Sequence, residues 1–390
     1  MIALTANRLY TPLDQVDRPL VLIEDQRIVE VTSRSAREVP QRAEVRDFGD
    51  SILAPGFIDI HIHGGAGHDV MENDSAGLPA IQKLLFKHGV TSFLPTTVTA
   101  PLDKTLSALD RLAGAIESAE RQPMSRSSHA TPRGIHLEGP FISHKCRGVH
   151  PSEDLLPPTL KTFEQLWQAA RGRIRVITIA PELAGASEVI TQAAKCGVCV
   201  SLGHSNATLA EARTGVAAGG SHFTHTFNAM RPLNHRDPGI LGEGLTNPNL
   251  SADIIADGIH LDPVVVKLFL RAKGPENTVL ITDAMSATGM PDGKYQLGSI
   301  EVELKQGKCL ANGVLAGSVL TMDVAVRNVM NFGGWDLQLA LRAATLNAAR
   351  VSRLANSGKL QAGAEADLVV LSPAGEVKTA MVRGFVEPSR

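Results

Sequence analysis

Eight apolar runs that alternate with amphipathic stretches, from Ala54 onward, are the feature that most constrains the fold of this 390-residue chain. Each run has the length of a strand and is apolar almost throughout, as expected for strands buried on both faces of a sheet. The stretches between them have helical periodicity, so repeated strand–helix units and a parallel sheet are predicted. The runs are Phe57–His63, Thr91–Val98, Gly134–Glu138, Val176–Pro181, Val198–His204, His222–Phe227, Leu250–Asp257 and Val279–Asp283.

Eight such units favour a closed barrel over an open, doubly wound sheet. The Gly-x-Gly-x-x-Gly pattern that opens a dinucleotide-binding sheet is absent after the first strand. We therefore predict an α/β fold with a TIM-like (β/α)8 barrel over residues 54–357. The flanking segments, 1–53 and 358–390, contain short strand-like runs and turns instead. Their simplest packing joins both ends of the chain in one small β-sandwich domain.

Composition excludes several classes of function. Acidic and basic residues are mixed along the chain, the net charge is -2, and only 4% of residues are aromatic, which argues against a nucleic-acid-binding protein. No run approaches the roughly 18 to 20 apolar residues that span a bilayer, and no signal peptide is recognised. Cys196-Gly-Val-Cys199 has no partner pair, so reduced, buried thiols are predicted. A cytoplasmic protein that acts on a small molecule is expected.

Histidines collect at the carboxyl ends of the predicted strands, where parallel barrels carry their active sites. His61 and His63 end the first strand, and residues two apart on a strand point to the same face. Taken alone, this pair could equally be two hydrogen-bonded core histidines. Chance, however, would scatter the chain's 13 histidines over helices and loops. The histidines at strand ends are His61, His63, His136, His204, His225 and His260.

Four of these imidazoles and two carboxylates make a donor set that suits a divalent first-row metal. Zinc is expected first, with iron, manganese and cobalt as alternatives. Six ligands are more than one tetrahedral ion needs, so two ions bridged by a carboxylate are predicted. The fourth strand has no lysine that could form a bridging carbamate, which leaves Glu138 as the bridge. The predicted ligands are His61, His63, Glu138, His204, His225 and Asp283.

This donor set predicts hydrolytic chemistry. A bound metal lowers the pKa of its water toward about 7 and so provides hydroxide at neutral pH. Asp283 is placed to take the proton of that water and to deliver it later to a leaving nitrogen. The alternative, in which Asp283 serves only as a ligand, is compatible with this role. The expected reaction is hydrolysis of a carbonyl compound or of a carbon–nitrogen bond.

Seven segments, in chain order, resemble the amidohydrolase superfamily and, within it, the family of N-acetylglucosamine-6-phosphate deacetylases. The resemblance covers nearly the whole chain, including both β-rich ends. The segments are Pro55–Asp59, His136–Pro140, Gly203–Ser205, His225–Met230, Asp257–His260, Thr282–Ala284 and Gly317–Met322.

The resemblance implies a metal-dependent deacetylase that converts N-acetylglucosamine 6-phosphate to glucosamine 6-phosphate and acetate, as a homodimer. The C4 epimer, N-acetylgalactosamine 6-phosphate, stays open as a substrate because it would be distinguished by a few pocket contacts only. Dihydroorotase-like and deaminase-like activities are more distant alternatives. A non-catalytic scaffold protein should have lost ligands, whereas every candidate position here is filled.

The resemblance also implies roles for single residues. Glu138, His204 and His225 match the family's core metal ligands, and Asp283 matches its catalytic aspartate. His150, in the segment Arg-Gly-Val-His, matches the histidine that holds the substrate carbonyl, so it is expected to stabilise the oxyanion.

Metal number and phosphate binding follow from the same resemblance. Some family members lack the strand-one histidines and hold one metal, so the presence of both His61 and His63 predicts the two-metal type. Arg236 offers a planar charged fork for phosphate, although it could instead form a surface ion pair. The positions that match sugar-phosphate-binding residues are Asn228, Ala229, Arg236 and His260.

Overall fold

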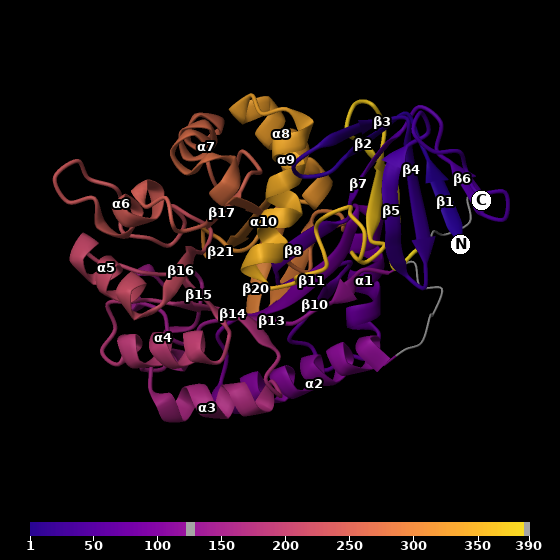
Figure 1. Cartoon of the computed structure of the whole chain (residues 1–390). Coiled ribbons are helices and arrows are strands. Elements are labelled where there is room, and N and C mark those ends of the chain that lie inside the picture. The colour runs from indigo at the N-terminus through magenta and orange to yellow at the C-terminus, as the bar shows by residue number, and fades with distance from the viewer. Residues whose placement is uncertain (122–128, 386–390) are drawn as a thin grey trace.

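The predicted parallel strands are present in the structure, a computed structural model that describes residues 1–121 and 129–385 (Figure 1). Six of them form one continuous parallel sheet, with β8 at one end and β16 at the other. The remaining two strands, β17 and β18, form a separate parallel pair. The eight strands are β8 (Phe57–Ile62), β11 (Val90–Thr97), β13 (Ile135–Glu138), β14 (Ile174–Ile179), β15 (Cys199–Leu202), β16 (Gly220–Phe223), β17 (Ala252–Ile255) and β18 (Thr278–Ile281).

A few backbone hydrogen bonds at each junction connect the β17–β18 pair to both ends of the longer sheet. The N–H of Phe223 donates to the carbonyl of Ser251 at 3.1 Å, and the N–H of Asp283 donates to the carbonyl of His61 at 2.9 Å. The parallel α/β architecture is therefore confirmed. Its closure into an eight-stranded barrel stays a prediction, because these bonds do not make continuous ladders.

Helices cover the outer face of the parallel strands, and most of them bury one apolar side against these strands (Figure 1). In α2, for example, Leu109, Leu112 and Ile116 are buried, whereas the opposite side of the helix is polar. The ten helices of the described residues are α1 (Gly77–Lys87), α2 (Leu102–Arg121), α3 (Leu160–Ala169), α4 (Ala186–Lys195), α5 (Leu209–Ala218), α6 (Gly239–Thr246), α7 (Pro263–Asn277), α8 (Met322–Gly333), α9 (Leu337–Ala344) and α10 (Leu346–Val351). None of them has the length and apolar character that a membrane crossing requires.

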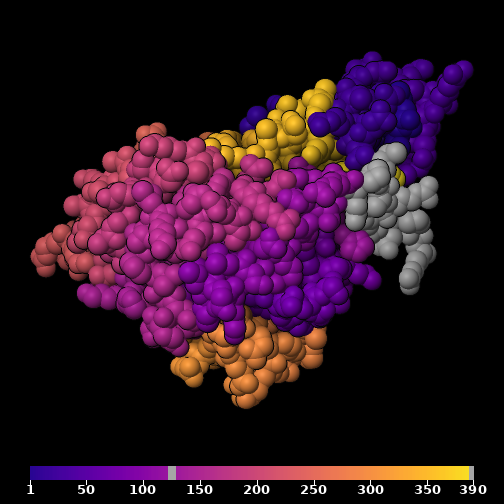
Figure 2. All heavy atoms as spheres, turned by 90° about the horizontal axis from the view of Figure 1, so that it is seen from below, coloured from indigo at the N-terminus to yellow at the C-terminus, as the bar shows by residue number. Residues whose placement is uncertain are grey.

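The two ends of the chain lie together in a second lobe (Figures 1 and 2), and their union in one β-sandwich domain stays a prediction. One sheet has the strand order β5-β4-β1-β6, and the other has the order β24-β23-β7-β2-β3. Leu4, Leu53 and Leu368 share one buried apolar cluster. The strands are β1 (Ile2–Thr5), β2 (Arg8–Tyr10), β3 (Gln15–Asp17), β4 (Pro19–Glu24), β5 (Arg27–Ser33), β6 (Glu44–Asp47), β7 (Ile52–Pro55), β23 (Leu368–Leu371) and β24 (Val377–Met381). The last residues of the predicted sandwich domain, 386–390, lie outside the described residues.

The chain forms a small antiparallel sheet after β18 and before α8, which was not predicted from the sequence. Its strands are β19 (Gly293–Leu297), β20 (Ile300–Lys305), β21 (Lys308–Ala311) and β22 (Val314–Leu315). It has its own apolar cluster, which includes Val302 and Cys309. All four cysteines are free, and Cys199 and Cys309 are buried, whereas Cys196, which was predicted to be buried, is only half-buried.

An ion-pair cluster joins the end of α1 to the first turn of α8. His88 Nδ1 lies 3.0 Å from Asp323 Oδ1, and Arg327 Nη2 donates to Asp323 Oδ2 at 3.2 Å. Burial raises the pKa of the Asp323 carboxyl, but the hydrogen bonds from His88 and Thr321 and the charges of His88 and Arg327 outweigh it and lower the pKa to about 2. The carboxylate therefore stabilises the fold above its ordinary pKa of 3.8, and this contribution is lost as the pH falls toward 2.

We expect Asp323→Asn to lower the free energy of unfolding at neutral pH by about 1 to 2 kcal/mol, because it removes two charge-assisted contacts. The difference between the variant and the unchanged protein should shrink as the pH falls below about 4. Urea unfolding curves across this range measure both effects. A difference in stability that does not change with pH would contradict the assignment.

Candidate metal centre and active site

Strand β8 brings His61 and His63 to the same face, as their spacing predicts. The two Nε2 atoms lie 3.2 Å apart, and both rings are buried. His63 Nδ1 donates to the carbonyl of Thr96 at 3.0 Å, which fixes the ring and leaves Nε2 as the nitrogen that faces the site.

The carboxylate of Glu138, at the end of β13, lies among four imidazoles. Its Oε1 is 3.1 Å from His225 Nε2, 3.3 Å from His204 Nε2 and 3.4 Å from His61 Nε2. Its Oε2 is 3.2 Å from His63 Nε2. One carboxylate is thus shared between the rings of strand one and the rings that follow strands β15 and β16, which is the placement expected of a bridging ligand.

Three of the predicted metal ligands have left-handed backbone conformations. The φ angles are +46° at His204, +27° at His225 and +51° at Asp283, and each residue follows the end of its strand by two positions. Non-glycine residues adopt this region at a cost, and such strain is typical of functional sites. The conformation also explains why β16 ends at Phe223, earlier than the sequence predicts.

Asp283 lies beside the strand-one histidines. Its Oδ1 is 3.2 Å from His63 Nε2 and 3.5 Å from His61 Nε2. Burial raises the pKa of this carboxyl, but the hydrogen bond from His63 and the charge of His61 outweigh burial, so the pKa lies well below its usual range. The side chain retains 12% exposure, and it borders the cavity above the cluster. The carboxylate is therefore ionised where it faces that cavity, which is the state that a proton acceptor must have.

His150 presents a neutral ring to the same cavity. Thr99 donates its backbone N–H to His150 Nδ1 at 3.3 Å, and its Oγ1 lies 2.8 Å from the same nitrogen. Because Nδ1 accepts, the proton is assigned to Nε2, which lies 3.7 Å from Glu138 Oε2. Burial, together with the nearby His204 ring, lowers the pKa of His150 to about 3. The ring is therefore an uncharged N–H donor near neutral pH.

A cavity of about 600 Å³ opens above these residues, and it has the size of a small-molecule site. Asn228, Ala229 and His260 line it, and His260 Nδ1 is 2.7 Å from Asp257 Oδ2. Arg236 does not line it; this residue lies on an exposed loop, where its backbone N–H donates to Asn234 Oδ1 at 2.9 Å. The structure therefore brings every predicted site residue except Arg236 to the cavity or to the ligand cluster beneath it.

Two buried aspartates support the cluster and were missed as site residues. Asp59 accepts hydrogen bonds from the backbone N–H of His61 at 3.3 Å and from the Thr282 hydroxyl at 2.5 Å, so it ties β8 to β18. Asp253 accepts from the backbone N–H of His225 and lies 2.9 Å from His222 Nε2. Both could have been found in the sequence, because each is a charged residue within an otherwise apolar strand.

His136, also at a strand end, has a structural role instead. Its Nδ1 donates to the carbonyl of Ile60 at 3.0 Å, and its Nε2 lies 2.8 Å from Thr178 Oγ1. Both ring nitrogens are therefore occupied by hydrogen bonds within the core.

The donor set fits divalent metal. Ligand atoms within 4.8 Å of one another form one group of His61, His63 and Asp283 and a second group of Glu138, His150 and His204. The Nε2 atoms of His204 and His225 are only 3.0 Å apart. Several Nε2 atoms that converge on one carboxylate are arranged as ligands around a cation.

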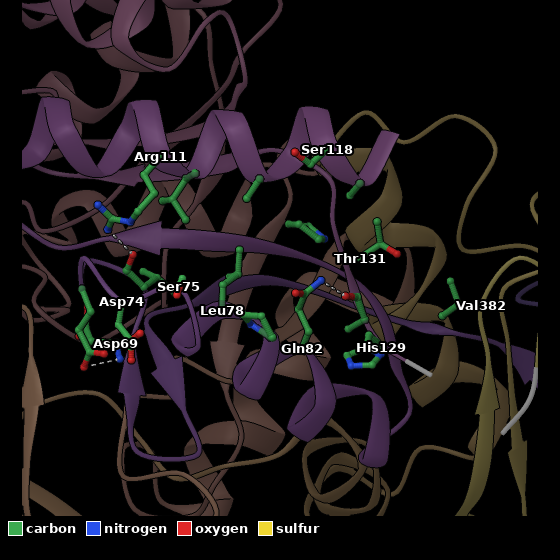
Figure 3. Close-up of a pocket in the computed structure, with 18 of the residues that line it drawn as sticks. Asp69, Asp74, Ser75, Leu78, Gln82, Arg111, Ser118, His129, Thr131 and Val382 are labelled. Carbon is green, nitrogen blue, oxygen red and sulfur yellow. Dashed lines mark hydrogen bonds between the residues drawn. The ribbon is translucent and has the colours of Figure 1, made fainter. Parts of the chain in front are cut away.

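A second cavity, of about 420 Å³, lies between α1, α2 and the lobe of the chain ends (Figure 3). Asp69, Leu78, Gln82, Arg111 and Val382 are among the residues that line it. None of the predicted site residues lines this cavity, so the chemistry described above belongs to the larger one.

Histidines and carboxylates that converge at the carboxyl ends of parallel strands define a site of the metal-dependent hydrolase class. Comparison with known proteins gives the family. The model of the amidohydrolase family matches residues 52–386. The chain belongs to the amidohydrolase family.

Its relatives in that family carry more specific names. An N-acetylglucosamine-6-phosphate deacetylase of Lysinibacillus sphaericus is 39% identical over 325 residues, which cover 82% of this chain and 81% of the relative. An N-acetylgalactosamine-6-phosphate deacetylase of Escherichia coli O157:H7 is 36% identical, with 98% of each chain covered. A variant of the Mycobacterium smegmatis N-acetyl-D-glucosamine-6-phosphate deacetylase, solved with N-acetyl-D-glucosamine 6-phosphate, superposes with a TM-score of 0.91 at 33% identity, covering 99% of this chain and 98% of its own.

We expect Glu138→Ala to lose most of its bound metal, because all four imidazoles lose their shared carboxylate. His136→Gln is the matched control, since His136 is equally buried but fully hydrogen-bonded in the core. The two variants are compared by the number of metal ions per folded chain, measured by plasma mass spectrometry. Full metal occupancy in Glu138→Ala would refute the bridging assignment.

Proposed function

We propose that this protein is a metal-dependent hydrolase that converts N-acetylglucosamine 6-phosphate to glucosamine 6-phosphate and acetate. The observation that carries the proposal is the Glu138 carboxylate shared by four imidazoles, with Asp283 beside them at a cavity of about 600 Å³. The names of the relatives support the substrate. The proposal includes a closed (β/α)8 barrel over residues 54–357 and a β-sandwich of 1–53 with 358–390, in a cytoplasmic homodimer.

The residues proposed to hold metal are the strand-one pair with Asp283, and His204 with His225, joined by Glu138. Zinc suits this mixture of imidazole and carboxylate ligands, and iron, manganese or cobalt are the alternatives. Bound there, a divalent cation polarises a carbonyl oxygen and makes water more acidic. Which metal is bound, and whether one or two ions fill the site, is decided by its measured content.

In the proposed mechanism, Asp283 and His150 divide the catalytic work. Asp283 removes a proton from the attacking water as its oxygen bonds to the amide carbon. The Nε2–H of His150 donates to the carbonyl oxygen, which becomes the oxyanion of the tetrahedral adduct. Asp283 then delivers its proton to the amide nitrogen, the oxyanion forms a carbonyl again and the carbon–nitrogen bond breaks. The products are the amine and acetic acid, which loses its proton to water to give acetate.

The sugar phosphate is proposed to contact Asn228, Ala229 and His260, which line the cavity. Arg236 lies on an exposed loop outside the lining. Its proposed phosphate contact is therefore made either by movement of the loop or in the cavity of the other subunit of a dimer. The mass of the protein in solution, by light scattering, tests the dimer.

The direct test is acetate release from both epimers at equal concentration. We expect release from N-acetylglucosamine 6-phosphate to be faster than from N-acetylgalactosamine 6-phosphate. The second substrate is a specific alternative because one relative is named for it. Faster acetate release from N-acetylgalactosamine 6-phosphate would make that compound the proposed substrate. If metal-loaded protein released acetate from neither compound, the proposed reaction would be wrong.

We expect Asp283→Asn to keep substrate binding and to lower kcat about 10²- to 10⁴-fold, because the amide cannot accept and return the proton. Steady-state kinetics and metal content on the same preparation measure the effect. A near-normal kcat would remove Asp283 as the acid–base residue. Loss of metal in parallel with kcat would assign it the role of ligand instead.

A further inference from the structure

The active-site cavity has a lysine that none of the proposed steps uses. Among the residues of 1–121 and 129–385 that line the cavity, Lys145 is the one lysine or arginine. The proposed substrate brings a phosphate with about two negative charges into a space that already contains two carboxylates. A cation in that space offsets the repulsion, whereas Arg236 lies outside the lining.

The base of Lys145 is fixed relative to the metal ligands. Lys145 lies in a short 3₁₀ turn, His144–Cys146. The carbonyl of Cys146 accepts a hydrogen bond from His204 Nδ1 at 2.9 Å, and the N–H of Ser143 donates to the carbonyl of His204 at 2.9 Å. These two hydrogen bonds fix the position of the turn relative to His204. The backbone of Lys145 therefore has a defined place on the cavity wall.

The end of the side chain is available to a ligand. Lys145 is exposed, and no carboxylate of the described residues forms an ion pair with it. A lysine without an ion-pair partner beside an anion site can follow the ligand on its flexible stem and neutralise it as a point charge. Asn206 and His260 line the same cavity and can add hydrogen bonds.

We propose that Lys145 binds the phosphate of the substrate, so that a cation for this group comes from the same chain as the metal ligands. The inference rests on the proposed function, because it names the residue that recognises the phosphate of that substrate. It assigns Lys145 to binding only, and the proton transfers stay with Asp283.

The test compares Lys145→Gln with Lys145→Arg and with Lys161→Gln, an exposed lysine of α3 that serves as control. Substrates are N-acetylglucosamine 6-phosphate and N-acetylglucosamine without phosphate. We expect Lys145→Gln to raise KM for the phosphorylated substrate about ten- to thirtyfold, with kcat within about twofold. Its kcat/KM for the unphosphorylated sugar should not change, and Lys145→Arg should restore most of the affinity.

Equal losses on both sugars would show a structural role for the turn and overturn the proposal. An unchanged KM in Lys145→Gln would also overturn it, most directly if Arg236→Gln alone raises KM. Inorganic phosphate separates this proposal from the reaction itself. If Lys145→Gln binds phosphate more weakly in calorimetry while the unchanged protein deacetylates neither sugar, the anion site stands and the proposed function fails.

Discussion

The carboxylate of Glu138 is the group on which the arrangement of the active site depends. It is almost completely buried, and an isolated carboxylate in such a place would be strongly destabilising. Four imidazole nitrogens lie within 3.4 Å of its oxygens. Because these rings come from three different strand ends, one charged group connects parts of the chain that are far apart in sequence. The site and the fold are therefore stabilised together.

Around this group, the parallel strands form a rigid frame, and the residues just after the strands set the direction of the ligand side chains. The left-handed turns at His204, His225 and Asp283 direct the side chains across the end of the sheet. Buried aspartates fix the backbone on both sides: Asp59 holds His61, and Asp253 holds His225. The strain of these turns is tolerated because the strands, the hydrogen bonds and the ligand cluster together determine one geometry.

The features of the fold and the site that depend on a regular spacing of residues could be predicted from the sequence. Continuous apolar runs indicated the parallel strands, and the spacing of His61 and His63 placed both rings on one face, because side-chain direction alternates along a strand. The closed barrel could not be derived with the same certainty, since closure depends on pairing between the first and last strands. The left-handed turns and the β19–β22 sheet were missed because they follow no period. Asp59 was read as part of a motif, yet its hydrogen bonds join residues 223 positions apart.

The same distinction explains why phosphate recognition was the least predictable part of the site. Metal ligands lie on or next to strands, so the sheet fixes their positions. Arg236 and Lys145 lie in loops, and resemblance alone selected Arg236. Of the two, Lys145 lines the cavity and its turn is hydrogen-bonded to His204 on both sides, whereas the phosphate contact of Arg236 stays a prediction. A loop residue can be assigned to a ligand when its backbone is tied to the catalytic frame. Lys145 meets this condition within one chain, whereas the proposed contact of Arg236 depends on movement of its loop or on the other subunit of a dimer.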